Sequence, residues 1–261
     1  MTGAAAWLDR RHRLCHALAI VLVAMAVVAP VLVIARTGTD RLGIDYRQYM
    51  EATRRWLDGG SFYQPWQLTG PYLIPPVPVT NLSELPVLYP PYALGLFVPA
   101  AIVPAFLWWL VPMAIIVWHV ADARPRAWAW LALGLLIAYP NTAWLVLSGN
   151  PVVWAAAALA GALRVGWPGA LVLIKPTLLP FAVAGIRTRG WYVSLAAIGI
   201  VSVALASMWA DYITVLMNAR GGAGLLYSLA DVPLMLIPVM AWIGRAERVQ
   251  FRTPRPIYPH E

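Results

Sequence analysis

Long apolar runs follow one another along almost the whole chain, separated by short polar or charged turns. A helix of roughly 17–25 apolar residues is long enough to cross a bilayer. The runs cover, in order, residues 14–35, 89–103, 105–121, 127–147, 151–164, 168–186, 191–210 and 225–244. This pattern predicts an all-α integral membrane protein, a multi-span helical bundle with about eight transmembrane helices.

The pattern does not decide whether the stretch from Tyr89 to Ala121 forms one transmembrane span or a hairpin of two. As one span its 33 residues exceed what a bilayer needs, and Pro99 and Pro104 are placed to break it into a hairpin. Cytoplasmic loops carry an excess of arginine and lysine. The hairpin puts nine arginines inside and four in short outer loops, whereas a single span puts seven inside and six outside. The hairpin is favoured, with both termini in the cytoplasm and residues 36–88 outside.

The outer loop 36–88 contains an amphipathic segment, which we predict as a helix over residues 45–58. Apolar side chains recur on one face at helical spacing, at Tyr46, Tyr49, Met50, Thr53, Trp56 and Leu57. Gly59 and Gly60 end the helix. We expect it to lie flat on the outer membrane surface, with its aromatic face toward lipid. The proline-rich segment 75–91 that follows cannot form a regular helix.

Asp45 is the first residue of this predicted helix, and its role has two interpretations. It is a favoured helix N-cap, and Gln48 three residues later completes a capping box. Alternatively, it is a carboxylate at the lip of a membrane-facing cavity, where partial burial raises its pKa and suits it to act as a general base. One residue is able to fill both roles.

Composition supports an integral membrane protein and excludes several kinds of partner and site. The chain of 261 residues is 61% hydrophobic and 11% charged, whereas soluble domains carry about a quarter charged residues. The net charge of +8 comes from arginines in short loops beside apolar runs, so we expect membrane lipids and no nucleic acid as partners. The single cysteine, Cys15, excludes an internal disulfide and a cysteine metal cluster. We expect no metal and no other cofactor.

The first apolar run, 14–35, follows Arg10, Arg11 and Arg13 and is too long for the core of a signal peptide. We therefore expect an uncleaved signal anchor in a multi-pass plasma-membrane protein. Residues 1–244 form the predicted transmembrane domain, and residues 245–261 form a basic cytoplasmic tail.

Four segments resemble one known family. "DYRQYMEATRRWLDGGSFY" (45–63) resembles the first outer loop of GT-C glycosyltransferases, and more narrowly that of glycosyltransferase family 87, the polyprenyl-phosphate-mannose-dependent bacterial enzymes. "YPPYALGLFVPAAIVP" (89–104), "SGNPVVWAAAALAGAL" (148–163) and "GALVLIKPTLLPFAVAGIRTRGW" (169–191) are similar to later segments of that family, in the same order. The likeness covers about residues 14–210. The chain lacks the glutamine of the family's Gly-Gln-Asn-like motif at 149–151 and is several spans shorter than typical members.

The resemblance implies a GT-C fold and a reaction outside the membrane. Such enzymes move a sugar, with inversion, from a polyprenyl phosphate donor to an acceptor hydroxyl on a lipid or glycan. By resemblance, Asp45 takes the acceptor proton. A base within hydrogen-bond reach contributes roughly 10²–10⁴ in rate, and positive charge stabilises the leaving phosphate.

Lys175 is the chain's only lysine and lies inside an apolar run, about 10 Å below the outer surface if the run starts at Pro168. An intramembrane charge suggests a functional site, here a phosphate contact. The alternatives are snorkelling or an ion pair with Asp211 or Asp231.

Weaker substrate-binding candidates are Tyr49, Glu84, Tyr89 and Arg220, the last in a glycine-rich outer loop that a plain turn explains as well. His119 and Asp122 are three residues apart, but two ligands do not make a metal site.

The sequence therefore favours a membrane mannosyltransferase of GT-C type, with Asp45 as base and Lys175 as phosphate contact. Two other classes stay open. A truncated, non-catalytic relative acting as a partner or scaffold would fit the short length. A small lipid or solute transporter would need an intramembrane lysine but not the helix led by Asp45.

Overall fold

The computed structural model describes residue 7 and residues 11–37, 39, 42–73, 82–220 and 229–246. Helices dominate these residues, so the predicted all-α class is confirmed. The one sheet pairs two residues of each strand in parallel, Tyr72 with Ala219 and Leu73 with Arg220. The basic tail from residue 247 and the glycine-rich segment 221–228 lie outside the described residues.

The helices and strands, in chain order, have the following bounds: α2 His12–Thr37, α3 Ile44–Leu57, α4 Pro65–Thr69, β1 Tyr72–Leu73, η1 Leu82–Glu84, η2 Pro91–Ala93, α5 Leu94–Ile102, α6 Leu107–Ala123, α7 Ala127–Ala138, α8 Pro140–Ser148, α9 Val152–Val165, η3 Trp167–Ile174, η4 Pro176–Leu178, α10 Leu179–Ala182, α11 Arg189–Ala204, α12 Met208–Asn218, β2 Ala219–Arg220 and α13 Val232–Ile243. Here η marks a 3₁₀ helix.

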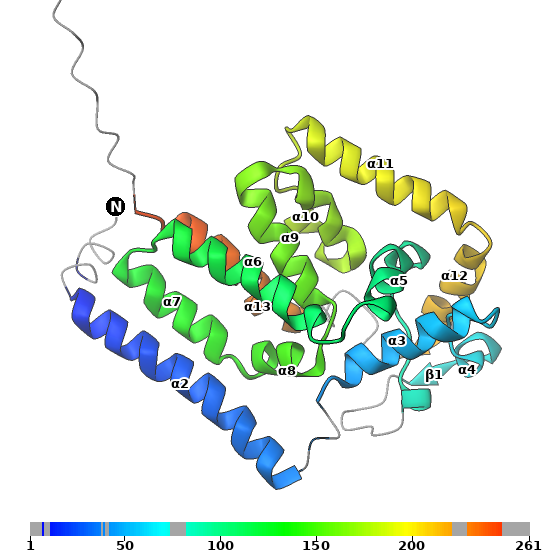
Figure 1. Cartoon of the computed structure of the whole chain (residues 1–261), viewed down its shortest axis with the longest axis horizontal. Helices are drawn as coiled ribbons and strands as arrows, with labels where there is room; N and C mark the ends of the chain where they lie inside the picture. Colours follow the sequence, from blue (N-terminus) through cyan, green and yellow to red (C-terminus); the bar gives the residue numbers. More distant parts are fainter. Residues whose placement is uncertain are drawn as a thin grey trace, which may run out of the picture.

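Helix α2 packs along α7, and the two run in the same direction (Figure 1). The ring of His16 lies 6.3 Å from that of Trp130, and one turn later Ala19 faces Gly134. A side chain on Gly134 would come within 3.0 Å of the Ala19 backbone, so a small residue is needed for this close approach. The rest of α2 exposes a continuous set of apolar side chains.

Among the described residues, α2 is the one helix long and apolar enough to cross a membrane without a break. The number rises to four if each of three bent helix pairs counts as one span: Pro91–Ile102 with Leu107–Ala123, Ala127–Ala138 with Pro140–Ser148, and Arg189–Ala204 with Met208–Asn218. Two shorter apolar helices, Val152–Val165 and Leu229–Ile243, complete the bundle.

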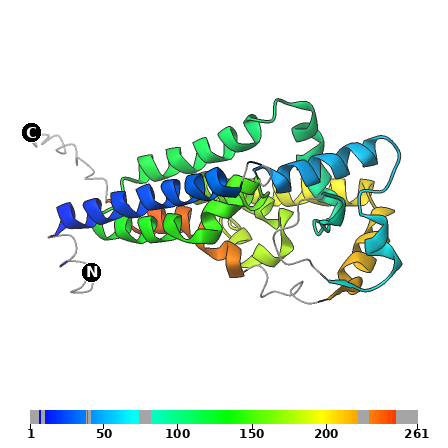
Figure 2. The same cartoon turned by 90° about the horizontal axis from the view of Figure 1, so that it is seen from below.

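The bundle has two distinct ends. We call one the amino end because it contains the first turn of α2; it also holds the turns 124–126, 164–166 and 185–189 and the end of α13. The backbone N–H of Arg126 donates to Gly244 O at 2.8 Å, Arg164 forms an ion pair with Asp122, and Gly166 lies against Gly185. These ends lie along one edge of the molecule, at the upper left in Figure 1. Helices α3, α4, α5 and α12 form the far end, on the right in Figure 2, and α8 contacts α3 there.

The eight-span path is wrong, because it separates segments that are in contact. It puts residues 124–126 outside and Arg245 inside, yet Pro125 and Arg245 form a β-bridge. It also puts residues 148–150 on the side opposite the loop 36–88, yet Gly43 N–H donates to Leu147 O at 2.8 Å.

The predicted path fails at residues 89–103, described below, and again at residues 168–186, which do not form one span. Pro168, Pro176 and Pro180 remove backbone donors at short intervals, so the segment folds as η3, η4 and the short α10. The chain turns at Lys175 and comes back, so that a side chain on Gly185 would meet Gly166 O at 2.2 Å. This hairpin returns the chain to the amino end. Residues 89–103 and 168–186 therefore both fail to run from one end of the bundle to the other. Helices α6 to α9, which lie between them, run opposite to the predicted direction, and α11 and α13 run as predicted.

The predicted break in 89–121 is confirmed, but its consequence differs. The segments before and after residues 103–106 meet at 113°. Instead of forming the first leg of a hairpin, α5 packs beside α3 at the far end, where Phe97 stacks on Tyr49 with ring centroids 5.2 Å apart.

The helix predicted over 45–58 is α3, and its N-terminus differs from the prediction. Gly43 is the N-cap, in a left-handed conformation with φ 63°, and makes no side-chain cap bond. Asp45 therefore lies inside the first turn, and Gln48 donates to Pro86 O at 2.9 Å instead of closing a capping box. Tyr49, Met50 and Thr53 of the predicted lipid-facing stripe are buried against protein, while Leu57 is exposed. Protein, not lipid, covers the middle of that face.

Candidate functional site

Asp45 lies at the centre of a polar cluster at the far end of the bundle. Its Oδ2 accepts two hydrogen bonds, from Ser148 Oγ at 2.8 Å and from Asn150 Nδ2 at 2.7 Å. Its Oδ1 accepts none from the described residues. One carboxylate oxygen is therefore held by two donors, and the other has no hydrogen bond to a described residue.

The turn that presents Ser148 and Asn150 depends on the glycine between them. Gly149 ends α8 in a left-handed conformation with φ 72°, which L residues rarely adopt. A side chain there would come within 2.7 Å of the Trp109 ring and 2.9 Å of Tyr46 Cβ. Trp108 Nε1 donates to Gly149 O at 2.8 Å and holds the turn against α6. This turn places the two donors against the first turn of α3.

The Asn150 amide is oriented by two other bonds. Its Oδ1 accepts the backbone N–H of Val152 at 3.0 Å, in the first turn of α9, and the Tyr89 hydroxyl at 3.3 Å. Because both partners are donors, the NH₂ group must face the opposite way, toward Asp45. Asn150 thus acts as a rigid donor to the carboxylate.

Burial raises the pKa of the Asp45 carboxyl above its ordinary value. The bonds from Asn150 and Ser148 and the positive charge of Lys175 work against this shift, and the negative charge of Asp231 adds to it. Lys175 and Asp231 are therefore close enough to act electrostatically on Asp45, although they come from distant parts of the chain.

Lys175 lies at the turn of the hairpin formed by η3, η4 and α10, and its Nζ is 2.5 Å from Asp231 Oδ2. The two side chains are 14% and 5% exposed, so the ion pair is largely buried. Of the two partners that the sequence suggested, the structure selects Asp231. The cluster thus contains two carboxylates and one ammonium group.

Tyr49 and Tyr89 form the wall behind this cluster. Both are buried, and their rings meet edge to face with centroids 4.9 Å apart. The Tyr89 hydroxyl donates to Asn150, whose amide donates to Asp45. The structure brings Asp45, Lys175, Tyr49 and Tyr89 into one region.

The other predicted residues are not in contact with Asp45. Glu84 is exposed on η1, and Arg220 is exposed on β2 beside Leu73. His119 Nε2 lies 3.1 Å from Pro238 O, while Asp122 pairs with Arg164. In the parts of the chain that the structure describes, no three His, Cys, Asp or Glu side chains are grouped to hold a metal.

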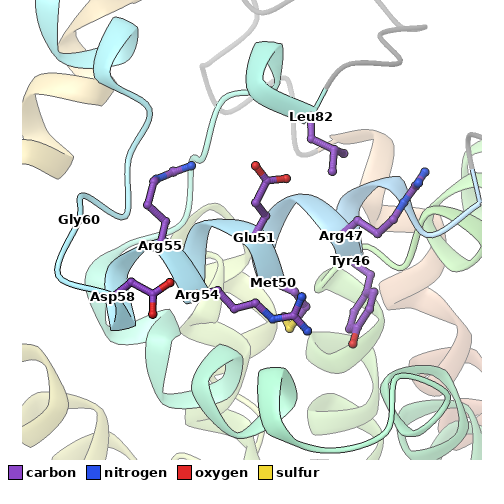
Figure 3. A pocket seen from close by; sticks show the side chains of 9 residues that line it. All are labelled: Tyr46, Arg47, Met50, Glu51, Arg54, Arg55, Asp58, Gly60 and Leu82. Atoms are coloured by element: carbon purple, nitrogen blue, oxygen red, sulfur yellow. The ribbon is translucent and has the colours of Figure 1, made fainter.

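A groove of about 650 Å³ runs along the exposed side of α3, next to this cluster. Its lining residues are Tyr46, Arg47, Met50, Glu51, Arg54, Arg55, Asp58, Gly60 and Leu82. Figure 3 shows Arg47, Glu51 and Arg55 on one side of the helix and Tyr46 and Met50 on the other. Tyr46 follows Asp45 directly and packs against Trp108 and Trp109, with centroids 5.7 and 5.1 Å away.

Ser148, Asn150 and Asp231 carry the geometry of the site, yet the sequence did not single them out as site residues. A signal was present for the first two, because "SGN" stands in a segment that resembles the family's Gly-Gln-Asn-like motif. For Asp231 the signal was a lone acid at the start of an apolar run. Comparisons with protein-family models, with curated proteins and with solved structures found no match for the chain.

Proposed function

We propose that this chain is a membrane glycosyltransferase that moves a sugar, mannose by its resemblance to family 87, from a polyprenyl phosphate donor to an acceptor hydroxyl. The observation that carries the proposal is the Asp45 carboxylate, with Oδ2 held by Ser148 and Asn150 and with Lys175 close enough to act on it electrostatically. The raised pKa of Asp45 makes it a stronger base than an exposed aspartate.

The reaction needs one proton acceptor and one positive charge. Asp45 Oδ1 takes the proton of the acceptor hydroxyl while the acceptor oxygen bonds to the anomeric carbon of the donor sugar. The bond between that carbon and the phosphate oxygen breaks, and its electron pair leaves with the polyprenyl phosphate. Lys175 stabilises the charge that develops on the leaving phosphate. Attack from the face opposite the phosphate inverts the anomeric carbon.

The groove along α3 is suited to the acceptor. Its volume of about 650 Å³ falls in the range of roughly 300–1,000 Å³ typical of ligand sites. Arginine and carboxylate side chains along it offer donors and acceptors to sugar hydroxyls. Tyr46 links the groove to the residue that would take the proton.

We further propose that six helical segments cross the plasma membrane, with the amino end in the cytoplasm. The segments are α2, α6, α7 with α8, α9, α11 and α13. The described arginines that are not part of the loop 36–88 are unevenly distributed between the two ends. One, Arg220, lies at the far end, and eight lie at the amino end. The eight are Arg11, Arg13, Arg124, Arg126, Arg164, Arg187, Arg189 and Arg245. This asymmetry is what the positive-inside rule expects of a cytoplasmic face.

Tryptophans at the amino end support its placement at a membrane–water interface. Arg11, Arg164 and Arg245 lie over the rings of Trp7, Trp118 and Trp242 at 4.6, 3.9 and 4.2 Å from the ring centroids. Tryptophan collects at the level of the lipid headgroups, and cation–π contacts keep the arginines there. The far end, with Asp45, then faces the outside.

Labelling of single cysteines tests this orientation. In a Cys15→Ala background, Gly70→Cys should react with a membrane-impermeant maleimide in intact cells, because a side chain there meets no other atom within 4 Å. Val165→Cys, at a 59% exposed position of the amino end, should react only after permeabilisation. Labelling of both variants in intact cells would contradict the six-span arrangement.

The transfer assay tests the function itself. We expect purified protein in lipid nanodiscs to bind labelled polyprenyl phosphate mannose and to transfer the label to an acceptor in a membrane extract. Donor binding without transfer would favour a non-catalytic relative. Absence of donor binding would contradict the proposal and favour a transporter.

A further inference from the structure

We propose that Asp231 holds Lys175 in place before the donor arrives and that the donor phosphate then takes over this ammonium group from Asp231. Asp231 would thus be a positioning residue that limits the affinity for the donor. The inference rests on the proposed function, because it identifies the ligand of Lys175 as a polyprenyl phosphate.

The position of the pair supports an exchange of partners. Lys175 lies between two 3₁₀ helices, at the turn of a hairpin, and not on a long rigid helix. Asp231 occupies the N-cap position of α13 but makes no side-chain cap bond. Its Oδ2 binds Lys175 instead, at 2.5 Å. The carboxylate therefore occupies the place next to the ammonium group that an anionic ligand would need.

The charges of the cluster lead to the same conclusion. Asp45 and Asp231 are two carboxylates acting on one ammonium group. A phosphodiester donor adds a further negative charge, and negative charges bound side by side repel each other. The ammonium group has three N–H donors and is able to bind two anions at once. Even so, Asp231 opposes the phosphate in either arrangement.

Stability alone does not account for a pair of this kind. A buried ion pair contributes little net stability compared with well-packed apolar residues, because both ions lose their hydration. The pair here is only 14% and 5% exposed, yet it stands next to a third charged side chain. A role of the Lys175 ammonium group in binding a ligand would explain why this ion pair is buried here.

The test measures the affinity of purified protein in nanodiscs for decaprenyl phosphate, with decaprenol as the ligand that lacks the charge. We expect Asp231→Asn to bind decaprenyl phosphate about tenfold more tightly than wild type, because a like charge has been removed. Asp231→Glu keeps the charge and should bind like wild type. The matched control is Asp122→Asn, which breaks the ion pair with Arg164 at the opposite end and should leave the affinity unchanged.

A second measurement uses the wild-type protein alone. Because Lys175 is the only lysine of the chain, ¹⁵N-lysine labelling gives a single side-chain NMR signal. We expect decaprenyl phosphate, but not decaprenol, to shift that signal toward its position in Asp231→Asn.

The outcomes distinguish a failure of this inference from a failure of the proposed function. If decaprenyl phosphate shifts the lysine signal but Asp231→Asn binds no more tightly than wild type, Asp231 does not compete with the phosphate and the inference is wrong. If wild type binds neither the charged nor the uncharged ligand, the proposed function fails, and the inference with it.

Discussion

Asp45→Asn is expected to lower the rate of sugar transfer by about 10²–10⁴-fold, the usual contribution of a general base. Asparagine is nearly the same size, and its Oδ1 is able to accept the bonds that Ser148 and Asn150 donate to the aspartate. It cannot take a proton from the acceptor hydroxyl. Single-turnover transfer at saturating donor measures the loss. Donor affinity should not fall, because the donor phosphate contacts Lys175 and the substitution removes a negative charge from the cluster.

The same variant also separates catalysis from folding. Because burial raises the pKa of Asp45, the native state binds its proton more tightly than the unfolded chain does. The stabilisation from this proton is complete below the ordinary aspartate pKa of about 3.9 and is lost as the pH rises through the raised value. At pH 7 the melting temperature of Asp45→Asn should therefore equal or exceed that of wild type, and the difference should shrink as the pH falls. A much lower melting temperature at pH 7 would mean that the lost activity reflects lost structure.

Wild-type activity should follow the same titration. Transfer is expected to decline as the pH falls through the raised pKa of Asp45, so the acid limb of the rate profile lies above the ordinary aspartate value of about 3.9.

Lys175→Met is expected to lower the free energy of unfolding by about 3–5 kcal/mol, the cost of leaving one partner of a buried ion pair without the other. Asp231 is 5% exposed and would keep its charge next to Asp45, with no ammonium group between them. Chemical or thermal unfolding in a mild detergent measures the change. The loss of Asp231 should cost less, because Lys175 keeps Asp45 as a neighbouring carboxylate.

The double variant Lys175→Met with Asp231→Asn is the control for this prediction. It removes both charges of the pair, so most of the lost stability should return. If the double variant is as unstable as Lys175→Met alone, the destabilisation comes from the changed turn between η3 and η4 and not from the unpaired carboxylate.

The sequence predicted the elements whose signals are local. Apolar periodicity located α3 within one residue at each end, and prolines located the break between α5 and α6. The N-cap was missed because Asp and Gly are both favoured there, and only the contact of Gly43 with Leu147 distinguishes them. Asp45 and Lys175 stood out because charged residues are rare in this chain.

The parts that depend on distant contacts could not be predicted. The run 168–186 is apolar enough to be a span, and nothing in its hydropathy shows that three prolines turn it back at Lys175. The error that moved Asp45 away from Asn150 was the predicted crossing at residues 89–103, because it reversed the direction of α6 to α9 in the predicted arrangement. The choice of Asp231 over Asp211 likewise depends on where α13 begins relative to the hairpin.

The central claim is that Asp45 acts as the base in a direct displacement at the anomeric carbon of a polyprenyl phosphate sugar. The most direct test is the anomeric configuration of the product that purified wild-type protein makes from ¹³C-labelled polyprenyl phosphate mannose, read from the one-bond C1–H1 coupling. A base-assisted displacement predicts a product with the configuration opposite to that of the donor. A product that retains the donor configuration, or no product from donor that is bound, would contradict the claim.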